Sequence, residues 1–326
     1  MFVRPMWGIV SAILALFCTV AGTHAAENPY PTKPIRIIVP YPPGGSTDPT
    51  ARAFGSWLSE KLGVSIVIDN RAGAGSTIGH ALGAAATPDG YTLLLGTSAG
   101  LVVSPALGTK VQYDSIKDFA PVGLCVYVPF LLVVHSSVPA KNMVEFIELA
   151  KAHPGEVRFG SPGTGTPNHL GIELLTALTG AKFTHVPYKG GGPATVDLIA
   201  GRIQAIFGSI PQWQPHFAGG KIRAIAIGHP TRLPQVPDVP AVAETIPGFN
   251  NTSWYALFAP AGTPAPIINK INAEMRKAVA NAEFSKFVES IGLVPASSTP
   301  KELGDMVRTE LARWTKVIHD AGIHVN

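Results

Sequence analysis

Short apolar, β-branched runs alternate with longer amphipathic segments along most of the chain, and this alternation constrains the fold more than any other feature of the sequence. The runs typical of strands cover residues 35–41, 65–69, 91–95, 130–135, 157–160, 203–207 and 222–227. The segments with helical spacing cover residues 48–62, 141–152, 167–178 and 193–200. A strand–helix–strand order implies parallel pairing with right-handed crossovers, so the predicted class is α/β.

The last third of the chain changes character. A strand-like run at 254–258 is followed by helical patterns at 264–280, 283–291 and 300–319. Thr299, Pro300 and Glu302 match a capping box with proline at the first helical position. A length of 326 residues suggests two domains at roughly 150 residues each, and no linker separates them. We therefore predict a discontinuous first domain, residues 26–122 and 228–326, interrupted by a second domain, residues 123–227.

The first 25 residues are typical of a secretory signal peptide. Arg4 precedes an apolar stretch at 9–22, and small residues follow it. That stretch is shorter than the roughly 20 residues of a membrane helix, so we predict cleavage near Ala25 and a periplasmic location. Acylation of Cys18 as a lipoprotein is disfavoured because the bulky Phe17 precedes it. Only Cys125 then remains, and its apolar surroundings predict a buried packing role.

Charge and composition exclude several classes of protein. Charged residues make up 14% of the chain and apolar residues 46%, which argues against disorder. The net charge is +4, but no basic run could follow a phosphate backbone, so we expect no nucleic-acid partner.

Three loops share one pattern, in which a strand-like run ends, small residues follow, and a helix begins. They cover residues 42–48, 161–167 and 188–193. Proline at 167 and at 193 would make Thr166 and Gly192 the N-caps and leave the preceding amides facing outward. The start of a helix favours anions, because its free N–H groups and its dipole are positive there. Each loop alone is ordinary turn chemistry, but three together predict a carboxylate or phosphate site.

Three other features of the sequence could indicate a nucleotide site, a hydrolase or a metal site. Gly73, Gly75 and Gly79 are one residue too widely spaced for a dinucleotide fingerprint. Residues 96–100 match the GxSxG elbow of a serine hydrolase, but the sequence after Ser98 is a poor helix start. The ten histidines are scattered without metal-ligand spacing, so no metal is expected. His169 alone is kept as a possible ligand donor, with a capped, solvent-facing role as the alternative.

Five ordered blocks make the chain similar to the Bug-type receptors of tripartite tricarboxylate transporters. The blocks cover residues 33–48, 69–75, 88–93, 185–191 and 257–264, which span almost the whole mature chain. The resemblance implies a two-domain, Venus-flytrap-like periplasmic receptor, each domain having a mostly parallel sheet flanked by helices. It implies no enzymatic activity and no cofactor. The implied partners are a small carboxylate and membrane permease subunits, and we expect a monomer.

The resemblance also assigns ligand-binding residues. In the first domain these are Gly44, Gly45, Ser46, Thr47, Thr97 and Ser98. In the second domain they are Ser161, Gly163, Thr164, Gly165, Thr166, His169, Gly191 and Gly192, and we add Ser209, which follows the strand at 203–207. They recast Ser98 as a ligand hydroxyl rather than a nucleophile.

One position departs from the family pattern. Many relatives carry aspartate or asparagine after the strand at 203–207, where this chain has Gly208 and Ser209. A ligand ammonium group would lack an acceptor there, so we expect a dicarboxylate or an aromatic acid rather than an amino acid. Two other functions remain open at this point, a secreted hydrolase that uses Ser98 and a ligand sensor that signals to a membrane kinase.

Overall fold

The computed structural model describes residue 1 and residues 30–43 and 45–323. The predicted signal peptide, its cleavage point and Gly44 lie outside the described residues. Within the described part, ten strands form one sheet, with the order β2-β1-β3-β9-β4-β7-β5-β6; β8 and β10 also pair with β4. Their bounds are β1 Ile35–Val39, β2 Ile66–Asn70, β3 Thr92–Thr97, β4 Phe119–His135, β5 Arg158–Ser161, β6 Thr184–Pro187, β7 Ala205–Ser209, β8 Ile222–Ile227, β9 Thr252–Pro260 and β10 Val294–Pro295.

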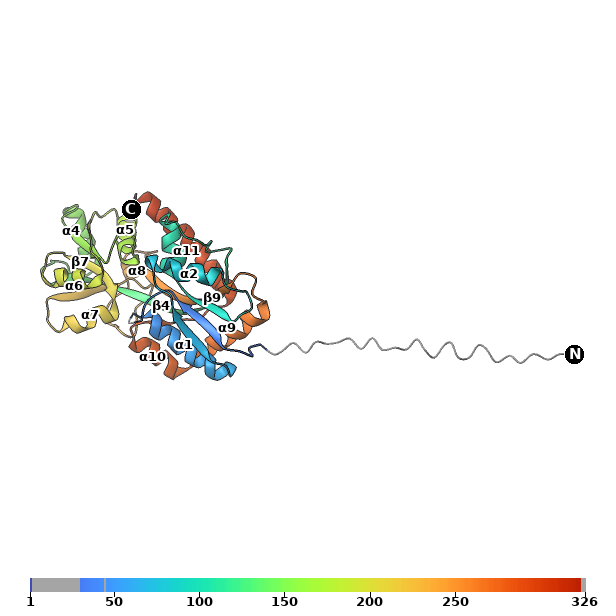
Figure 1. The fold of residues 1–326 in the computed structure, drawn as a ribbon. Helices are drawn as coiled ribbons and strands as arrows, with labels where there is room; N and C mark the ends of the chain where they lie inside the picture. Colours follow the sequence, from blue (N-terminus) through green and yellow to red (C-terminus); the bar gives the residue numbers. More distant parts are fainter. Residues whose placement is uncertain (2–29, 44, 324–326) are drawn as a thin grey trace.

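The helices gather at the two ends of this sheet (Figure 1). Those at one end are α1 Thr47–Leu62, α2 Thr77–Ala84, α9 Ala265–Ala280, α10 Ala282–Ser290 and α11 Pro300–Asp320. Those at the other end are α4 Met143–Ala152, α5 Pro167–Thr179, α6 Gly191–Ile199, α7 Ile210–Phe217 and α8 Val242–Thr245. Three short helical turns complete the chain: η1 Ala74–Ser76, η2 Ala99–Val103 and α3 Ser104–Ala106. We call the two ends the first lobe and the second lobe.

The predicted α/β class is confirmed, but the pairing is mixed. β1 pairs in parallel with β2 and β3, and β5 pairs in parallel with β6 and β7. By contrast, β4 and β9 run antiparallel to their neighbours. The expectation that strand–helix–strand order sets all the pairing was therefore too simple. β4 and β9 lie between the two sets of parallel strands in the sheet. Long connections lead into both strands, so their direction is not encoded in the local sequence.

The strand β4 joins the two lobes. Its first part, up to Pro129, pairs with β9, and its second part, from Phe130, pairs with β7 and β8. The sequence predicted only the second part as a strand. Cys125 lies in the first part and is fully buried, which confirms its predicted packing role.

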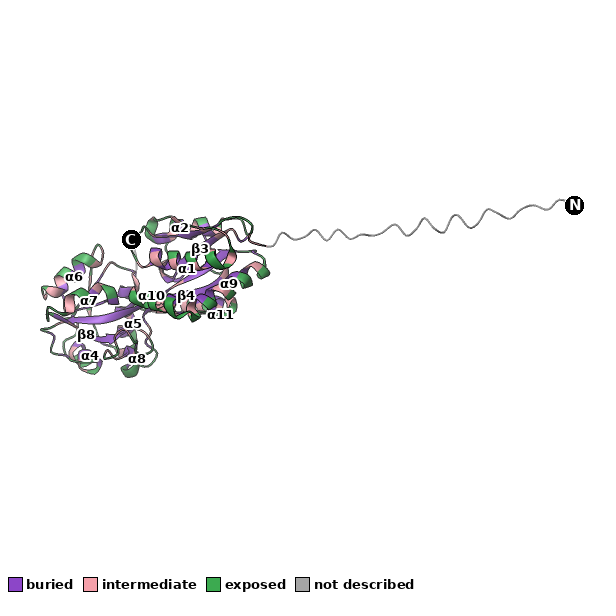
Figure 2. Ribbon diagram, turned by 90° about the horizontal axis from the view of Figure 1, so that it is seen from below, coloured by how far each residue is buried: buried purple, intermediate pink, exposed green. Residues whose placement is uncertain are grey.

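Helix ends follow the capping signals closely. Thr299 Oγ1 accepts a hydrogen bond from the Glu302 N–H, and the Glu302 carboxylate accepts one from the Thr299 N–H, which confirms the predicted capping box. The sequence did not predict α2, α7 or β6. Buried residues follow the sheet, and exposed ones lie on the outer helix faces (Figure 2). Among the described helices, none combines the length and the apolar character that a membrane crossing requires.

Candidate functional site

The carboxyl ends of the parallel strands from both lobes meet along β4. Thr97, at the end of β3, pairs with Tyr255 on β9, which pairs in turn with Val126 on β4. Ser209, at the end of β7, pairs with Phe130 on the same strand. The two pairing points are four positions apart on β4, about 13 Å along a strand. Ligands of open α/β sheets bind outside such strand ends, so this register brings two sets of binding loops to one region.

The start of β9 holds the first-lobe loops together. Ser46 Oγ lies 2.8 Å from Tyr255 Oη, and Ser98 Oγ lies 2.6 Å from Ser253 Oγ. Residue Gly45 is exposed and Thr47 is buried at the start of α1. Of the first-lobe candidates, Ser46 and Ser98 are thus brought to one edge of the sheet through neighbours on β9.

His80, on α2, supports the turn that carries Thr97. Its Nδ1 bonds to the Ser76 carbonyl at 2.8 Å, and its Nε2 accepts the Thr97 N–H at 3.3 Å. The ring is completely buried, and burial lowers the pKa of His80 to about 4. A Cβ at Gly100 would lie 2.2 Å from the ring, so this position requires glycine. Neither the support by His80 nor the packing at Gly100 was predicted.

Ser98 is the residue that would act as the nucleophile of a serine hydrolase. A helical turn, η2, does follow this serine, so the prediction of a poor helix start was wrong. A serine nucleophile needs a base, however, usually an imidazole. In the described part of the chain, Ser98 Oγ is bonded to Ser253 and no histidine reaches it, since both nitrogens of His80 have other partners. The turn therefore lacks the base of a hydrolase.

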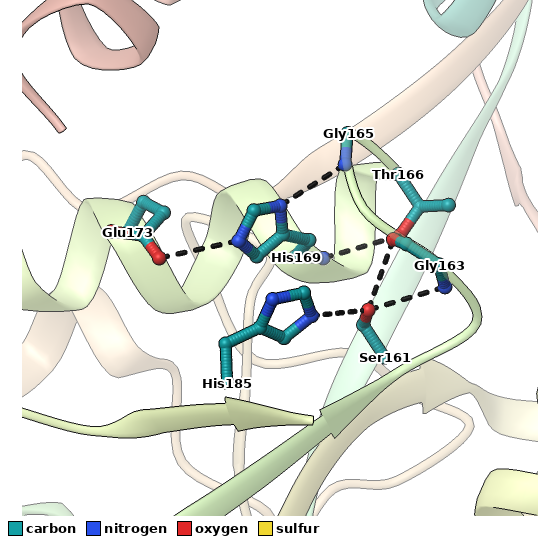
Figure 3. A network of polar contacts seen from close by, with 7 residues as sticks. All are labelled: Ser161, Gly163, Gly165, Thr166, His169, Glu173 and His185. Atoms are coloured by element: carbon teal, nitrogen blue, oxygen red, sulfur yellow. Dashed lines mark hydrogen bonds and ion pairs between the residues drawn. The ribbon is translucent and has the colours of Figure 1, made fainter. Parts of the chain in front are cut away.

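The second-lobe loop after β5 is closed by its own hydroxyl groups (Figure 3). Ser161 Oγ donates to the Gly163 carbonyl at 3.0 Å and accepts the Gly163 N–H at 3.2 Å. Thr166 Oγ1 donates to the same carbonyl and accepts the N–H of His169, so Thr166 is the N-cap of α5 as predicted. Thr164 is exposed at the tip of the loop. The prediction that the loop amides face outward was wrong for Gly163, because the Ser161 hydroxyl turns that N–H inward.

His169 turns a second amide of this loop inward. Its Nδ1 accepts the Gly165 N–H at 3.0 Å, and its Nε2 lies 3.3 Å from Glu173 Oε1 (Figure 3). The ring stacks on His185, with centroids 3.8 Å apart. His169 is only 4% exposed, so the solvent-facing alternative was wrong. Burial and the neighbouring His169 lower the pKa of His185 to about 4, against the opposite effect of Glu173.

The third loop lies beside the second. The Gly190 N–H donates to the Pro162 carbonyl at 2.9 Å, and Gly190 has a φ of 107° that favours glycine. Gly190, not Gly192, is therefore the N-cap, and α6 begins at Gly191. The prediction for Gly192 was wrong because Pro193 is tolerated throughout the first helical turn. Gly192 is exposed.

Ser209 ends β7 and is the N-cap of α7 without a side-chain capping bond. The preceding Gly208 faces α7, where an added Cβ would lie 2.3 Å from the indole nitrogen of Trp213. Trp213 is fully buried, and its indole N–H has no partner among the described residues. The space beside Gly208 is thus filled by the side chains of Trp213 and Gln212.

Two further features concern metal ligands and a hollow in the first lobe. Within residues 30–43 and 45–323, no three His, Cys, Asp or Glu side chains gather closely enough to hold a metal ion. A hollow of about 680 Å³ lies between α1 and α10, lined by Trp57 and Phe287 among others. None of the predicted ligand-binding residues lines this hollow, so it is separate from the loops described above.

Comparisons with known proteins agree with this architecture. A model of the tripartite tricarboxylate transporter family receptor matches residues 50–323. Protein BugT of Bordetella pertussis is 37% identical over 315 residues, covering 95% of this chain and 97% of that protein. A UPF0065 protein of a Pseudomonas species is 37% identical over 320 residues, covering 97% of this chain and 95% of that protein.

Solved structures are similar over nearly the same length. R. palustris Rpa4515 with adipate is 34% identical, with a TM-score of 0.76, covering 90% of this chain and 99% of that one. MatC from Rhodopseudomonas palustris with bound malate is 33% identical, with a TM-score of 0.70, covering 89% and 100%. The periplasmic binding protein BugD is 30% identical, with a TM-score of 0.71, covering 90% and 99%.

Proposed function

We propose, from the premise that the chain belongs to the tripartite tricarboxylate transporter receptor family, that its ligand is a linear dicarboxylate. The protein is a periplasmic solute receptor and not an enzyme. In our proposal the ligand lies between the two sets of strand ends that meet along β4, with one carboxylate toward each lobe. The meeting of these strand ends at Val126 and Phe130 is the observation that carries the proposal.

Helix starts on both lobes supply the attraction for anions. The first lobe offers the start of α1 beside Gly45 and Ser46, and the second offers the starts of α5 and α6 beside Thr164 and Gly192. The amide dipoles of a helix start stabilise a negative charge without a buried arginine. Among the described candidates, Gly45, Thr164 and Gly192 are the exposed ones, and we infer that they and their neighbours contact the ligand.

The second-lobe strand end disfavours an amino-acid ligand. A bound ammonium group needs an acceptor, and Gly208 offers no side chain. The side chains nearest to Gly208 are the indole N–H of Trp213, which is a donor, and the neutral amide oxygen of Gln212, so neither of them is a carboxylate that could balance an ammonium charge. Adipate and malate, which carry two carboxylates and no ammonium group, are bound in two of the similar structures. A dicarboxylate therefore fits this chain better than aspartate or glutamate does.

Closure of the two lobes would favour a dicarboxylate over a monocarboxylate. A ligand shifts a conformational equilibrium only by its difference in affinity for the two states, and a dicarboxylate can contact both lobes at once. The sequence predicts moving units at residues 26–122 with 228–326 and at 123–227, but β4 pairs with β9 of the first lobe up to Pro129 and α8 lies in the second lobe, so we infer that both crossings come later in the chain. The change of β4 partners at Pro129 and Phe130 favours a first crossing near those residues. We infer further that the receptor is a monomer cleaved near Ala25 and that it delivers its ligand to permease subunits.

A thermal-shift panel tests the ligand class. Adipate and malate are compared with hexanoate, benzoate and aspartate, and hexanoate serves as the matched control because it has the chain length of adipate with one carboxylate. A ligand at 100 times its dissociation constant adds about 2.7 kcal/mol to the free energy of unfolding. We expect stabilisation by at least one dicarboxylate and much less by its monocarboxylate counterpart. Equal stabilisation by hexanoate, or a preference for aspartate, would contradict the proposal.

A further inference from the structure

His169 connects the second-lobe loop to α5 through one hydrogen bond that its ring accepts and one contact at ion-pair distance with a carboxylate. Its Nδ1 must be unprotonated, because it accepts the Gly165 N–H at 3.0 Å. Its Nε2 faces the Glu173 carboxylate at 3.3 Å and therefore carries the proton. The structure thus requires a neutral ring with the proton on Nε2.

The Gly165 amide has no other acceptor within this network. Gly165 has a φ of 75°, and its N–H points toward the buried ring of His169 (Figure 3). The other links of the loop are backbone hydrogen bonds or involve the Ser161 and Thr166 hydroxyls, and neither kind of group titrates near neutral pH. The link from Gly165 to His169 is therefore the loop contact that a proton can break directly.

We propose that His169 is the positioning residue of the ligand loop at 161–166, and that protonation of its ring weakens ligand binding by releasing the Gly165 amide. An imidazolium has N–H groups at both nitrogens, so its Nδ1–H would face the Gly165 N–H, donor against donor. The readout of affinity rests on the proposed receptor function. The position of the Gly165 amide can be measured without any ligand.

The titratable groups around the ring have opposing effects. Glu173, one turn further along α5, favours the imidazolium, whereas a second positive charge on the stacked His185 of β6 would oppose it. His185 stays neutral above about pH 4, because burial and the adjacent His169 lower its pKa to that value. Its Nε2 contacts Ser161 Oγ at 2.7 Å, and Ser161 already donates to Gly163, so His185 is the donor in that contact.

The charged residues of the other elements packed on α5 have partners elsewhere or lie at the far end of a strand. The only charged residue of β5 is Arg158, at the far end of the strand, and β7 has none. On α11, Glu310 accepts the indole N–H of Trp254, and Arg313 donates to the Asn250 carbonyl. Glu173 and His185 are therefore the charged or titratable partners whose contacts with this ring the structure shows.

Two substitutions separate the two roles of the ring. His169→Asn places an amide oxygen where Nδ1 lies, which keeps the acceptor for Gly165 and removes the titration. His169→Gln extends toward Glu173 and lacks the acceptor for Gly165. His153→Gln changes an exposed histidine and is the matched control. The dissociation constant of the best dicarboxylate from the thermal-shift panel is measured by calorimetry from about pH 8 to about pH 5.

The expected results differ for each protein. The ratio of the wild-type to the His169→Asn dissociation constant should rise as the pH falls, because only the wild-type ring can lose its Nδ1 acceptor to a proton. Using this ratio removes the effect of the ligand's own titration. His169→Gln should bind about tenfold more weakly than the wild type at about pH 8, and His153→Gln should follow the wild type. A ratio that stays flat with pH, or full affinity in His169→Gln, would overturn the proposal.

Hydrogen exchange of the ligand-free protein gives an independent readout. A peptide covering residues 161–169 should exchange faster in His169→Gln than in His169→Asn, and faster in the wild type than in His169→Asn at the lower pH. Equal exchange in all three proteins overturns the positioning role even if no dicarboxylate binds. Failure of every dicarboxylate, with the expected exchange pattern present, would instead refute only the proposed ligand.

Discussion

Acidification should destabilise the first lobe through His80, and the size of the effect follows from the burial of its ring. His80 is completely buried between the Ser76 carbonyl and the Thr97 N–H, and both contacts use the neutral ring. Burial lowers its pKa from 6.5 to about 4. The unfolded chain therefore binds a proton at a higher pH than the folded protein does. Stability is complete above the unfolded value of 6.5 and falls as the pH drops toward 4.

The linkage relation converts these two pKa values into a free energy. One pKa unit corresponds to about 1.36 kcal/mol, so the full effect of His80 is about 3 kcal/mol. Between pH 7 and pH 5 the expected loss is about 2 kcal/mol, because the unfolded chain is mostly protonated at the lower pH while the folded protein is mostly not. That window lies above the range in which most carboxylates titrate.

Urea unfolding at several pH values measures this loss, with tryptophan fluorescence as the signal. His185 also has a lowered pKa and contributes in the same window, so the informative quantity is the difference between the wild type and His80→Gln. Glutamine keeps one donor and one acceptor but does not titrate, so the difference should change by about 2 kcal/mol between pH 7 and pH 5. His153→Gln, at an exposed position, should run parallel to the wild type. Parallel curves for His80→Gln and the wild type would refute the reasoning.

Two further predictions concern packing. A Cβ at Gly171 on α5 would lie 2.0 Å from the side-chain nitrogen of Asn251, so Gly171→Ala should cost about 1–3 kcal/mol and lower the melting temperature. At Gly192 the added carbon would have no neighbour within 4 Å, so Gly192→Ala should change stability by less than about 0.5 kcal/mol. Similar melting temperatures for the two variants would show that Asn251 moves away from position 171 at little cost, which would contradict the first prediction. The Cys125 thiol is fully buried and burial raises its pKa, so a thiol reagent should label it only after denaturant is added, and rapid labelling of the native protein would contradict its placement.

Helix boundaries were predictable from the sequence where a few adjacent residues determine them. Thr166 and Thr299 are N-caps as predicted, each followed by proline at the first helical position. Proline has its φ already set for the helix and the threonine oxygen satisfies a free N–H, so both signals act within four residues. The third helix start was misplaced by two residues because Gly190 is held by a bond to Pro162, which lies in another loop.

The inward direction of the loop amides could not be predicted from the loop itself. Gly163 and Gly165 look alike in the sequence, as small residues before a helix, and both were expected to face outward. In the structure one N–H is bonded to the Ser161 hydroxyl and the other to the His169 ring. The His185 ring, brought by β6, stacks on that of His169. This arrangement depends on which strand lies beside β5.

The amino-acid sequence by itself determined the α/β class, the helix caps and the three loops, because periodicity, capping and glycine content act over one or two turns of chain. Only the tertiary structure decided that β4 continues through 17 residues and pairs with β9 in one half and with β7 and β8 in the other. Strand direction and register depend on hydrogen bonds to partners roughly 70 to 140 residues away along the chain. Those partners bring the end of β3, through β9, and the end of β7 to points four positions apart along β4, where we propose that the two lobes hold a single ligand.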